Sequence, residues 1–353
     1  MKKVDYIIVG CGLAGIAFCE QLRANNKSFL VFDDASQQSS SVAVGLYNPV
    51  VLKRFTKVWK AKELLSLALP RYKALEDFLK IKLDYKIPVY RKFSSIEEQN
   101  QWFSTADKPS LVNYLSIDII TNSNPKINAP YGFGEVLQTG RIDTNALVVN
   151  YRNYLDECSM LKREQFDFNE LVFHDDFAGY KDMTAKHIVF AEGFGVVNNP
   201  YFKELPLNVA KGELIIIKSP GLKIDFILKS SVFIVPLGNN LYSVGATYNW
   251  KDQTNAITEE GRKELENKLK TIISCKYEVI GQVAGIRPTV KDRRPLVGVH
   301  SKYKNLFVLN GLGTRGVLNA PYVAEQLFDF IENNVPLDKE IDIRRFSSLL
   351  EEG

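Results

Sequence analysis

The chain has 353 residues, enough for two domains at the usual ~150 residues per domain. Its 45% hydrophobic and 24% charged residues are ordinary for a packed globular protein and exclude a disordered chain. The net charge is only +4, and no stretch approaches the ~18 uninterrupted apolar residues that a membrane span needs. Four cysteines without CxxC or zinc spacing predict free thiols, no metal site and a cytoplasmic location.

The first 33 residues read as a strand, a glycine turn, a helix and a second strand. Residues 4–9 are apolar and β-branched, as in a strand that is buried on both faces. Helical spacing follows over 16–25, and a second apolar strand covers 28–33. The turn between the first strand and the helix contains Gly10, Gly12, Leu13, Ala14 and Gly15. This order is that of a dinucleotide-binding GxGxxG motif in its βαβ context.

Each glycine of this turn has a mechanical reason. Gly10 permits the tight turn, Gly12 lets a pyrophosphate approach the backbone, and Gly15 lets helix and strand pack closely. The helix N-terminus presents unpaired N–H groups and a partial positive charge to the phosphates. Asp33 and Asp34 end the second strand, where Asp33 can accept hydrogen bonds from a ribose. The motif leaves the choice between FAD and NAD open.

The next segment is helical and basic. Residues 58–80 have helical spacing, and Pro70 is expected to break or kink this helix. Between residues 51 and 92, twelve Lys or Arg face four Asp or Glu, a local charge of +8. Such a segment is either a solvated helix face or a surface that meets an anionic partner such as tRNA.

The rest of the chain changes from irregular to β-rich and back to α/β. Residues 83–129 are irregular, and Asp143 is a good capping residue for a helix over 145–155. A buried strand ends near Gly193, and a string of short β-runs separated by Gly, Pro and Asn is typical of an antiparallel sheet. These runs cover 214–217, 226–228, 232–235 and 242–247. The last predicted elements are a helix at 259–273, a strand at 306–309, a second glycine turn and a helix from about 321 to 331.

Alternating β/α patterns at both ends around a β-rich middle predict an α/β plus α+β fold. We expect a Rossmann-like nucleotide-binding domain interrupted by a substrate domain built on an antiparallel sheet. The first would be discontinuous, and its predicted limits are 1–80, 140–205 and 281–353. The limits predicted for the substrate domain are 81–139 and 206–280.

Five segments together resemble the FAD-dependent D-amino-acid oxidase, glycine oxidase and sarcosine oxidase superfamily. They are residues 10–15 with Asp33, SSVAVGL at 40–46, AKGEL at 210–214, AGIRPT at 284–289 with the following D and PLVG, and NGLGTRG with APYVAE at 310–325. The resemblance implies FAD as the cofactor. It also implies FAD contacts at Ser41, Gly45, Leu46, Gly193, Gly311, Gly313, Thr314, Arg315, Gly316 and Val317.

The resemblance further implies that Arg287 grips a substrate carboxylate, which suits the two parallel donors of a guanidinium. The alternative is an arginine paired with a structural acid such as Asp292. Arg315 either adds positive potential beside the flavin or braces its turn. The implied reaction oxidises the C–N bond of an amino acid or N-substituted glycine by hydride transfer to flavin N5, followed by hydrolysis of the imine. It needs no catalytic acid–base pair, and none is assigned.

Three positions depart from the superfamily pattern. Phe233 stands where several amino-acid oxidases place a tyrosine, and Glu192 replaces a small or neutral residue. Residues 242–247 lack the lysine that sarcosine oxidases use for oxygen activation. The pattern therefore does not establish whether a hydroxyl group contacts the substrate. It also leaves open whether oxygen or another acceptor reoxidises the flavin.

The C-terminal segment is most similar to the FAD-dependent domain of the bifunctional bacterial tRNA wobble-uridine-modifying enzyme, through GLGTRGVLNAPYVAE and the residues that follow. This similarity implies an alternative function, the oxidation of a carboxymethylaminomethyl group on tRNA. A third alternative is a non-catalytic flavin-binding scaffold or assembly factor. The main prediction is an enzyme for a small amine or amino acid that carries a carboxylate, and the oligomeric state stays open.

Overall fold

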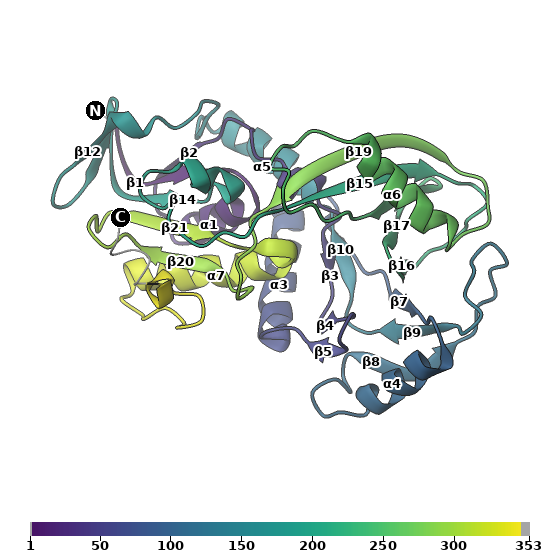
Figure 1. Ribbon diagram of the computed structural model, residues 1–353. Helices are drawn as coiled ribbons and strands as arrows, with labels where there is room; N and C mark the ends of the chain where they lie inside the picture. The colour runs from purple at the N-terminus through teal and green to yellow at the C-terminus, as the bar shows by residue number, and fades with distance from the viewer. Residues whose placement is uncertain (1, 347–353) are drawn as a thin grey trace.

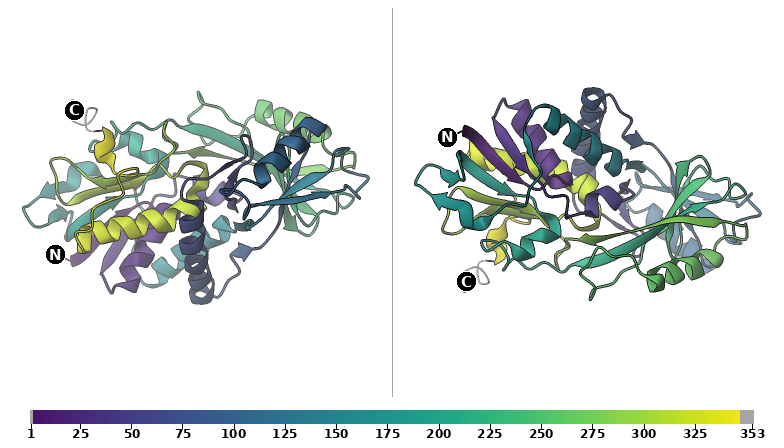
Figure 2. Two further views of the ribbon diagram at one scale, coloured as in Figure 1. Left: turned by 90° about the horizontal axis from the view of Figure 1, so that it is seen from below. Right: turned by 90° about the horizontal axis from the view of Figure 1, so that it is seen from above.

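The computed structural model describes residues 2–346, which form two lobes (Figure 1). The left lobe combines the first strand, β1 (Lys2–Val9), with the last long helix, α7 (Gly316–Glu332). Seen from below and from above, α7 lies against the N-terminal segment, where it packs on α1 (Leu13–Ala24) (Figure 2). The two ends of the described chain therefore build one lobe.

A mixed sheet forms the centre of the left lobe. Its order is β11–β2–β1–β14–β13–β12, and β21 joins it beside β14 with β20 outside. Strands β11, β2, β1, β14 and β21 run parallel, and β2 is buried along its whole length. The remaining bounds are β2 (Phe29–Phe32), β11 (Leu161–Lys162), β12 (Leu171–Phe173), β13 (Ala178–Tyr180), β14 (Met183–Phe190), β20 (Leu296–Val299) and β21 (Leu306–Asn310). The apolar runs predicted as doubly buried strands are confirmed.

Two prolines lie inside helices, contrary to the sequence prediction. Helix α3 (Ala61–Leu79) continues through Pro70, and α7 begins five residues before Pro321 rather than at it. A proline at position 321 cannot donate to the carbonyl of Val317. Tyr72 of α3 donates its hydroxyl to that carbonyl at 2.8 Å, so a neighbouring helix satisfies the freed acceptor. Pro70 lies on the exposed side of α3, where water is available.

The right lobe is built on an eight-stranded sheet in the order β19–β15–β18–β17–β16–β7–β9–β8. Every neighbouring pair is antiparallel except β16 and β7, which are parallel. Strand β7 comes from the first third of the chain and lies far from β16 in the sequence. These two parallel strands are therefore not joined by a hairpin. The bounds are β7 (Val89–Lys92), β8 (Leu115–Ile120), β9 (Phe133–Val136), β15 (Ala210–Lys218), β16 (Ile227–Lys229), β17 (Phe233–Gly238), β18 (Leu241–Gly245) and β19 (Glu278–Arg287).

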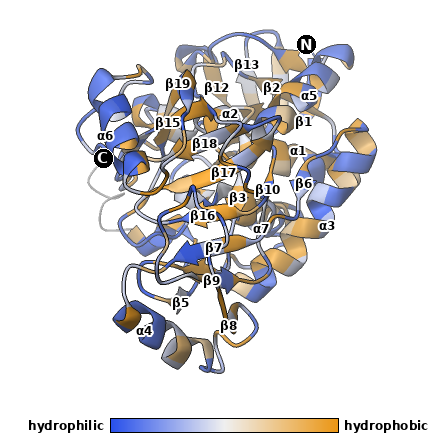
Figure 3. Cartoon of the chain, turned by 90° about the vertical axis from the view of Figure 1, so that its right-hand side faces the viewer, coloured by the Kyte–Doolittle hydropathy of each residue, from blue (hydrophilic) through white to orange (hydrophobic). Residues whose placement is uncertain are grey.

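The two faces of this sheet have different partners. Helix α6 (Glu259–Lys270), which begins after the capping residue Thr258, covers one face by packing Leu265 and Leu269 against the strands. The helix is largely hydrophilic and contacts β15 and β18, whereas β16 and β17 in the middle of the sheet are hydrophobic (Figure 3). The opposite face carries Arg287 and turns toward the left lobe. Strand β19 crosses the predicted domain limit at residue 280, and the domain division stays a prediction.

The segment 83–129, predicted as irregular, contains the helix α4 (Ile96–Ala106). Ser95 caps it by accepting from the backbone N–H of Glu98, so the pattern Ser-x-x-Glu was an available start signal. The predicted helix at 145–155 is confirmed as α5 (Thr144–Glu157), capped by Asp143. The remaining elements are α2 (Ser39–Val42) and the short strands β3 (Leu46–Tyr47), β4 (Val50–Val51), β5 (Thr56–Lys57), β6 (Asp84–Tyr85) and β10 (Gly140–Ile142).

Across residues 2–346, none of the helices combines the length and the apolar character needed to cross a membrane.

Candidate cofactor and substrate site

The residues predicted to contact the cofactor gather at one edge of the left-lobe sheet. Gly10 follows β1, Asp33 follows β2, Gly193 follows β14, and Gly311 follows β21. These four strands are parallel, so their carboxyl ends share an edge, which is where ligands bind in open α/β sheets.

The turn between β1 and α1 leaves no room for side chains. Gly10 has a φ of +102°, and a Cβ there would lie 2.5 Å from the carbonyl oxygen of Ala191. A Cβ at Gly15 would overlap the carbonyl oxygen of Gly10, so the helix and the strand are in backbone contact. Helix α1 starts after Gly12 with no side-chain cap and no acidic residue in its first turn. These features fit a dinucleotide diphosphate at the helix N-terminus.

The C-terminal glycine turn lies next to the N-terminal one. A Cβ on Gly316 would lie 3.1 Å from the Leu13 side chain, so the first turns of α7 and α1 meet. Asn310 donates to the carbonyl of Gly193 at 2.8 Å and accepts from the N–H of Gly311 at 2.7 Å. The same turn carries Gly313, Thr314, Arg315 and Val317.

Helix α2, which contains Ser41, lies between the glycine turn of the left lobe and the right-lobe sheet. The N–H of Leu13 donates to Ser40 Oγ at 3.1 Å, and a Cβ at Gly285 of β19 would lie 2.7 Å from Val42. The chain then passes Gly45 and Leu46 into β3. The predicted cofactor residues therefore lie around one junction between the lobes, where Asp34 and Thr314 are exposed.

Asp33 has a partner that sequence reasoning missed. Its Oδ2 lies 2.6 Å from a guanidinium nitrogen of Arg152 on α5. Burial raises the pKa of Asp33, and the charge of Arg152 opposes this shift. Asp34 is exposed and accepts from the N–H of Ser36. The role of Asp33 as a ribose ligand stays a prediction, with Arg152 fixing the orientation of its carboxylate.

Glu192, one of the departures in the sequence, lies at the same sheet edge. Burial raises its pKa to about 7, and Asn199 donates to its Oε2 at 2.7 Å. The side chain of this acid is therefore held within the protein.

Arg287 ends β19 and lies across the neighbouring strand β15. A Cβ at Gly212 would overlap its guanidinium, so only glycine lets the side chain lie there. The guanidinium makes one long hydrogen bond, 3.5 Å, to the carbonyl of Thr247, and its Cζ lies 4.7 Å from the ring centre of Tyr248. Burial lowers the pKa of Arg287. Within residues 2–346 it forms no ion pair.

The alternative that Arg287 pairs with Asp292 is wrong. Asp292 accepts instead from Nε of Arg345 at 2.9 Å, and from the N–H of Arg294. Arg345 also donates to the carbonyl of Pro295, which ties the chain after β19 to the C-terminal segment. Asp292, the carboxylate nearest to Arg287 in the sequence, therefore binds Arg345, and the guanidinium donors of Arg287 are available to a ligand.

Arg315 contacts a neighbouring segment, and its two predicted roles, adding positive potential beside the flavin and bracing its own turn, stay predictions. It donates to the carbonyl of Asn48 at 2.9 Å and forms no ion pair in the described part of the chain. Burial, followed by the charge of Arg293, lowers its pKa to about 10. The N–H of Gly313 donates to the carbonyl of Pro288, so this turn and the one after Arg287 are bonded. Two guanidinium groups without carboxylate partners therefore share this junction.

Sequence reasoning missed Tyr248, whose ring centre lies 4.7 Å from Cζ of Arg287. The available signal was the pair Tyr248 and Trp250 in an otherwise polar connection between a strand and a helix.

At Phe233, the ammonium of Lys229 lies 4.4 Å from the ring. Burial lowers the pKa of this lysine to about 8.

The basic segment 51–92 is partly neutralised by acids. Three of its pairs join distant parts of the chain or neighbouring elements: Lys60 with Asp338, Arg71 with Glu325, and Arg91 with Glu98. Lys73, Lys82 and Lys86 pair within the segment. The cations for which the described residues provide no ion pair are Lys53, Arg54, Lys57, Lys62, Lys80 and Lys92.

Comparison with known sequences agrees with this geometry. The family model described as FAD dependent oxidoreductase matches residues 5–329. Glycine oxidase of Bacillus subtilis (strain 168) is 24% identical over 359 residues, covering 94% of each protein. The tRNA 5-methylaminomethyl-2-thiouridine biosynthesis bifunctional protein MnmC of Campylobacter jejuni subsp. doylei is 21% identical over 311 residues, which are 84% of this chain and 46% of that protein.

Solved structures share the fold. Glycine oxidase from Geobacillus kaustophilus has a TM-score of 0.77 at 19% identity, over 98% of both chains. Iminodiacetate oxidase from Chelativorans sp. BNC1 has a TM-score of 0.77 at 16% identity, over 95% of this chain and 98% of that one. The predicted fold class and FAD as the cofactor are confirmed. Because the family match runs from the first strand into the last long helix, this protein belongs to the FAD-dependent oxidoreductases and is an enzyme.

Proposed function

We propose that the protein oxidises the C–N bond of an amino acid or an N-substituted glycine whose carboxylate is bound by Arg287. The observation that carries this proposal is the guanidinium without an ion pair in the described chain. A charge removed from water is costly unless it is paired, and a substrate carboxylate supplies the missing partner. The names of the relatives glycine oxidase and iminodiacetate oxidase describe small amines that carry such a group.

The residues of the site bind and orient. Arg287 offers two parallel donors to the carboxylate, and Gly212 beneath it sets the height of the guanidinium above the strand. Tyr248 covers the other side of the group. FAD held at this sheet edge would supply the acceptor for the hydride that leaves the substrate carbon. Holding that carbon in a fixed place accounts for much of the rate of such a reaction, and the side chains need supply no acid or base.

Anaerobic mixing of the FAD-loaded protein with matched amines tests this function. We expect glycine and N-methylglycine to bleach the visible flavin band, and their amides to do so at least about 100-fold more slowly, because the amides lack the charge that Arg287 binds. The amides serve as the control for access to the site. If none of a panel of carboxylate-bearing amines reduces the flavin, the enzyme assignment to this substrate class fails and a flavin-binding scaffold is favoured.

A second candidate is an N-substituted glycine carried on tRNA, supported by the similarity to the MnmC protein over 84% of this chain. The six cations of segment 51–92 without ion pairs are the phosphate contacts available there. If all six bind phosphates, affinity for tRNA falls by about 1,000-fold between 50 and 200 mM salt. A filter-binding titration across this range measures the slope, and an affinity that does not depend on salt excludes this segment as an RNA surface.

A further inference from the structure

Two large aromatic side chains are exposed beside Arg287. Tyr248 is 58% exposed and Trp250 is 51% exposed, although side chains of this size are mostly hidden in folded proteins. Their ring centres lie 6.4 Å apart, with planes 27° from parallel. Asn249 between them pairs with Lys211 of β15 as a β-bridge, so Tyr248 and Trp250 point to the same side of an extended segment. We call this pair the aromatic platform.

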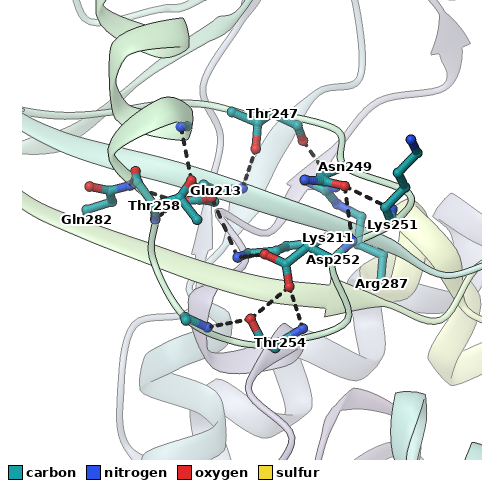
Figure 4. A network of polar contacts seen from close by, with 12 residues as sticks. Lys211, Glu213, Thr247, Asn249, Lys251, Asp252, Thr254, Thr258, Gln282 and Arg287 are labelled. Carbon is teal, nitrogen blue, oxygen red and sulfur yellow. Dashed lines mark hydrogen bonds and ion pairs between the residues drawn. The ribbon is translucent and has the colours of Figure 1, made fainter.

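The loop that carries the platform is fastened to the sheet (Figure 4). Lys211 is 1% exposed, and its ammonium lies 2.5 Å from Oδ2 of Asp252. The hydrogen bond from Lys211 lowers the pKa of Asp252 to about 2, so this carboxylate is ionised at neutral pH. The N–H groups of Lys211 and Asn249 each donate to the other's carbonyl, at 2.8 and 3.0 Å. The platform is therefore held in one place before any ligand arrives.

Two further contacts fix the far end of the loop. The buried carboxylate of Glu213 accepts from the N–H and the hydroxyl of Thr258, at 2.8 and 2.6 Å, and from Gln282 at 2.7 Å. Asn255 donates to the carbonyl of Ser36 at 3.1 Å, across to the left lobe. The loop thus joins the lobes at the mouth of the site. Its position is set relative to both the substrate arginine and the cofactor edge.

We infer that the aromatic platform selects substrates whose amine nitrogen carries a planar ring, that is, N-substituted glycines with an aromatic or heteroaromatic substituent. This inference rests on the proposed function. A carboxylate on Arg287 places the amine within two bonds of the bound group, and Tyr248 and then Trp250 lead outward from that point. Flat rings stack favourably on exposed aromatic faces, whereas a saturated ring of the same size gains only from burial.

The test compares N-benzylglycine with N-(cyclohexylmethyl)glycine, which share a carbon skeleton but carry an aromatic and a saturated ring, respectively. We expect kcat/KM of the FAD-loaded protein to favour the aromatic compound by about tenfold. Trp250→Leu brings this ratio close to one, whereas Trp250→Phe, which keeps a ring, retains most of it. Phe177→Leu is the matched control, because Phe177 is also an exposed aromatic residue and lies on a turn of the left lobe.

A ratio near one in the unaltered protein, or a ratio unchanged in Trp250→Leu, overturns the inference and leaves the proposed function intact. Flavin reduction by no carboxylate-bearing amine at all rejects the proposed function itself. Whether the ring belongs to a free nucleoside or to an RNA is tested with 5-(carboxymethylaminomethyl)uridine. It is offered both as the free nucleoside and within a stem-loop RNA. In either form, Trp250→Leu lowers kcat/KM by about tenfold if the platform binds the base, and no loss in both forms argues against it.

Discussion

Replacing Arg287 with methionine is expected to lower kcat/KM for glycine and N-methylglycine by about 1,000-fold. Two charge-assisted hydrogen bonds at about 1.5–3 kcal/mol each correspond to roughly 100-fold to 10,000-fold in binding. Methionine keeps an unbranched apolar stem over Gly212 and under Tyr248, so the packing of the strand is preserved. Stopped-flow flavin reduction against substrate concentration separates the loss of binding from any loss in the chemical step.

The controls for this variant use the neighbouring charges. Asp292→Asn removes the negative charge that Arg345 binds and leaves Arg287 untouched, so kcat/KM should change by less than about threefold. Arg287→Lys keeps the charge without the planar fork, and its kcat/KM should lie between that of Arg287→Met and that of the unaltered protein. Unaltered binding of carboxylates by Arg287→Met would remove the central support for the proposed substrate class.

Gly15→Ala is expected to weaken FAD binding by about 100-fold, through strain of roughly 3 kcal/mol. The added Cβ would overlap the carbonyl oxygen of Gly10, so α1 must move away from β1. That movement displaces the helix N-terminus from the diphosphate site. Titration of the apoprotein with FAD, followed by quenching of flavin fluorescence, measures the dissociation constant.

Gly281→Ala provides the matched comparison, because a Cβ there would meet Ile216 at an ordinary 3.7 Å. This variant should bind FAD like the parent protein. Circular dichroism distinguishes a folded Gly15→Ala protein with weak FAD binding from an unfolded one. A folded Gly15→Ala protein with the parent's affinity would show that the close approach of α1 to β1 is not required.

The elements that could be predicted from sequence are those specified by neighbouring residues. The β1–α1–β2 unit follows from a short apolar run, a glycine turn and helical spacing, all within 33 residues. Arg287 could be singled out because it stands in a short motif. That Asp292 does not pair with Arg287 could not be predicted, because the partner of Asp292 is Arg345, which is 53 residues away in the chain.

The parts that could not be predicted depend on contacts between distant segments. Pro321 is tolerated inside α7 because the hydroxyl of Tyr72, about 250 residues earlier in the chain, supplies the hydrogen-bond donor that proline lacks. Arg152 meets Asp33 only after α5 packs against α1 and β11. The loop of Tyr248 is positioned by Lys211, a residue whose side chain reads locally as a charge that should face water. Local patterns contain none of this information.

The pairing of β14 with β21 has a consequence for how the protein is made. Strand β21 ends at Asn310, whose side chain closes the edge by bonding to Gly193, and α7 follows it. During synthesis on the ribosome, β1 and the glycine turn emerge almost 300 residues before this strand can dock. The predicted flavin site can therefore close only after residue 310 has emerged, and nascent chains stalled before residue 310 should be released without retained flavin.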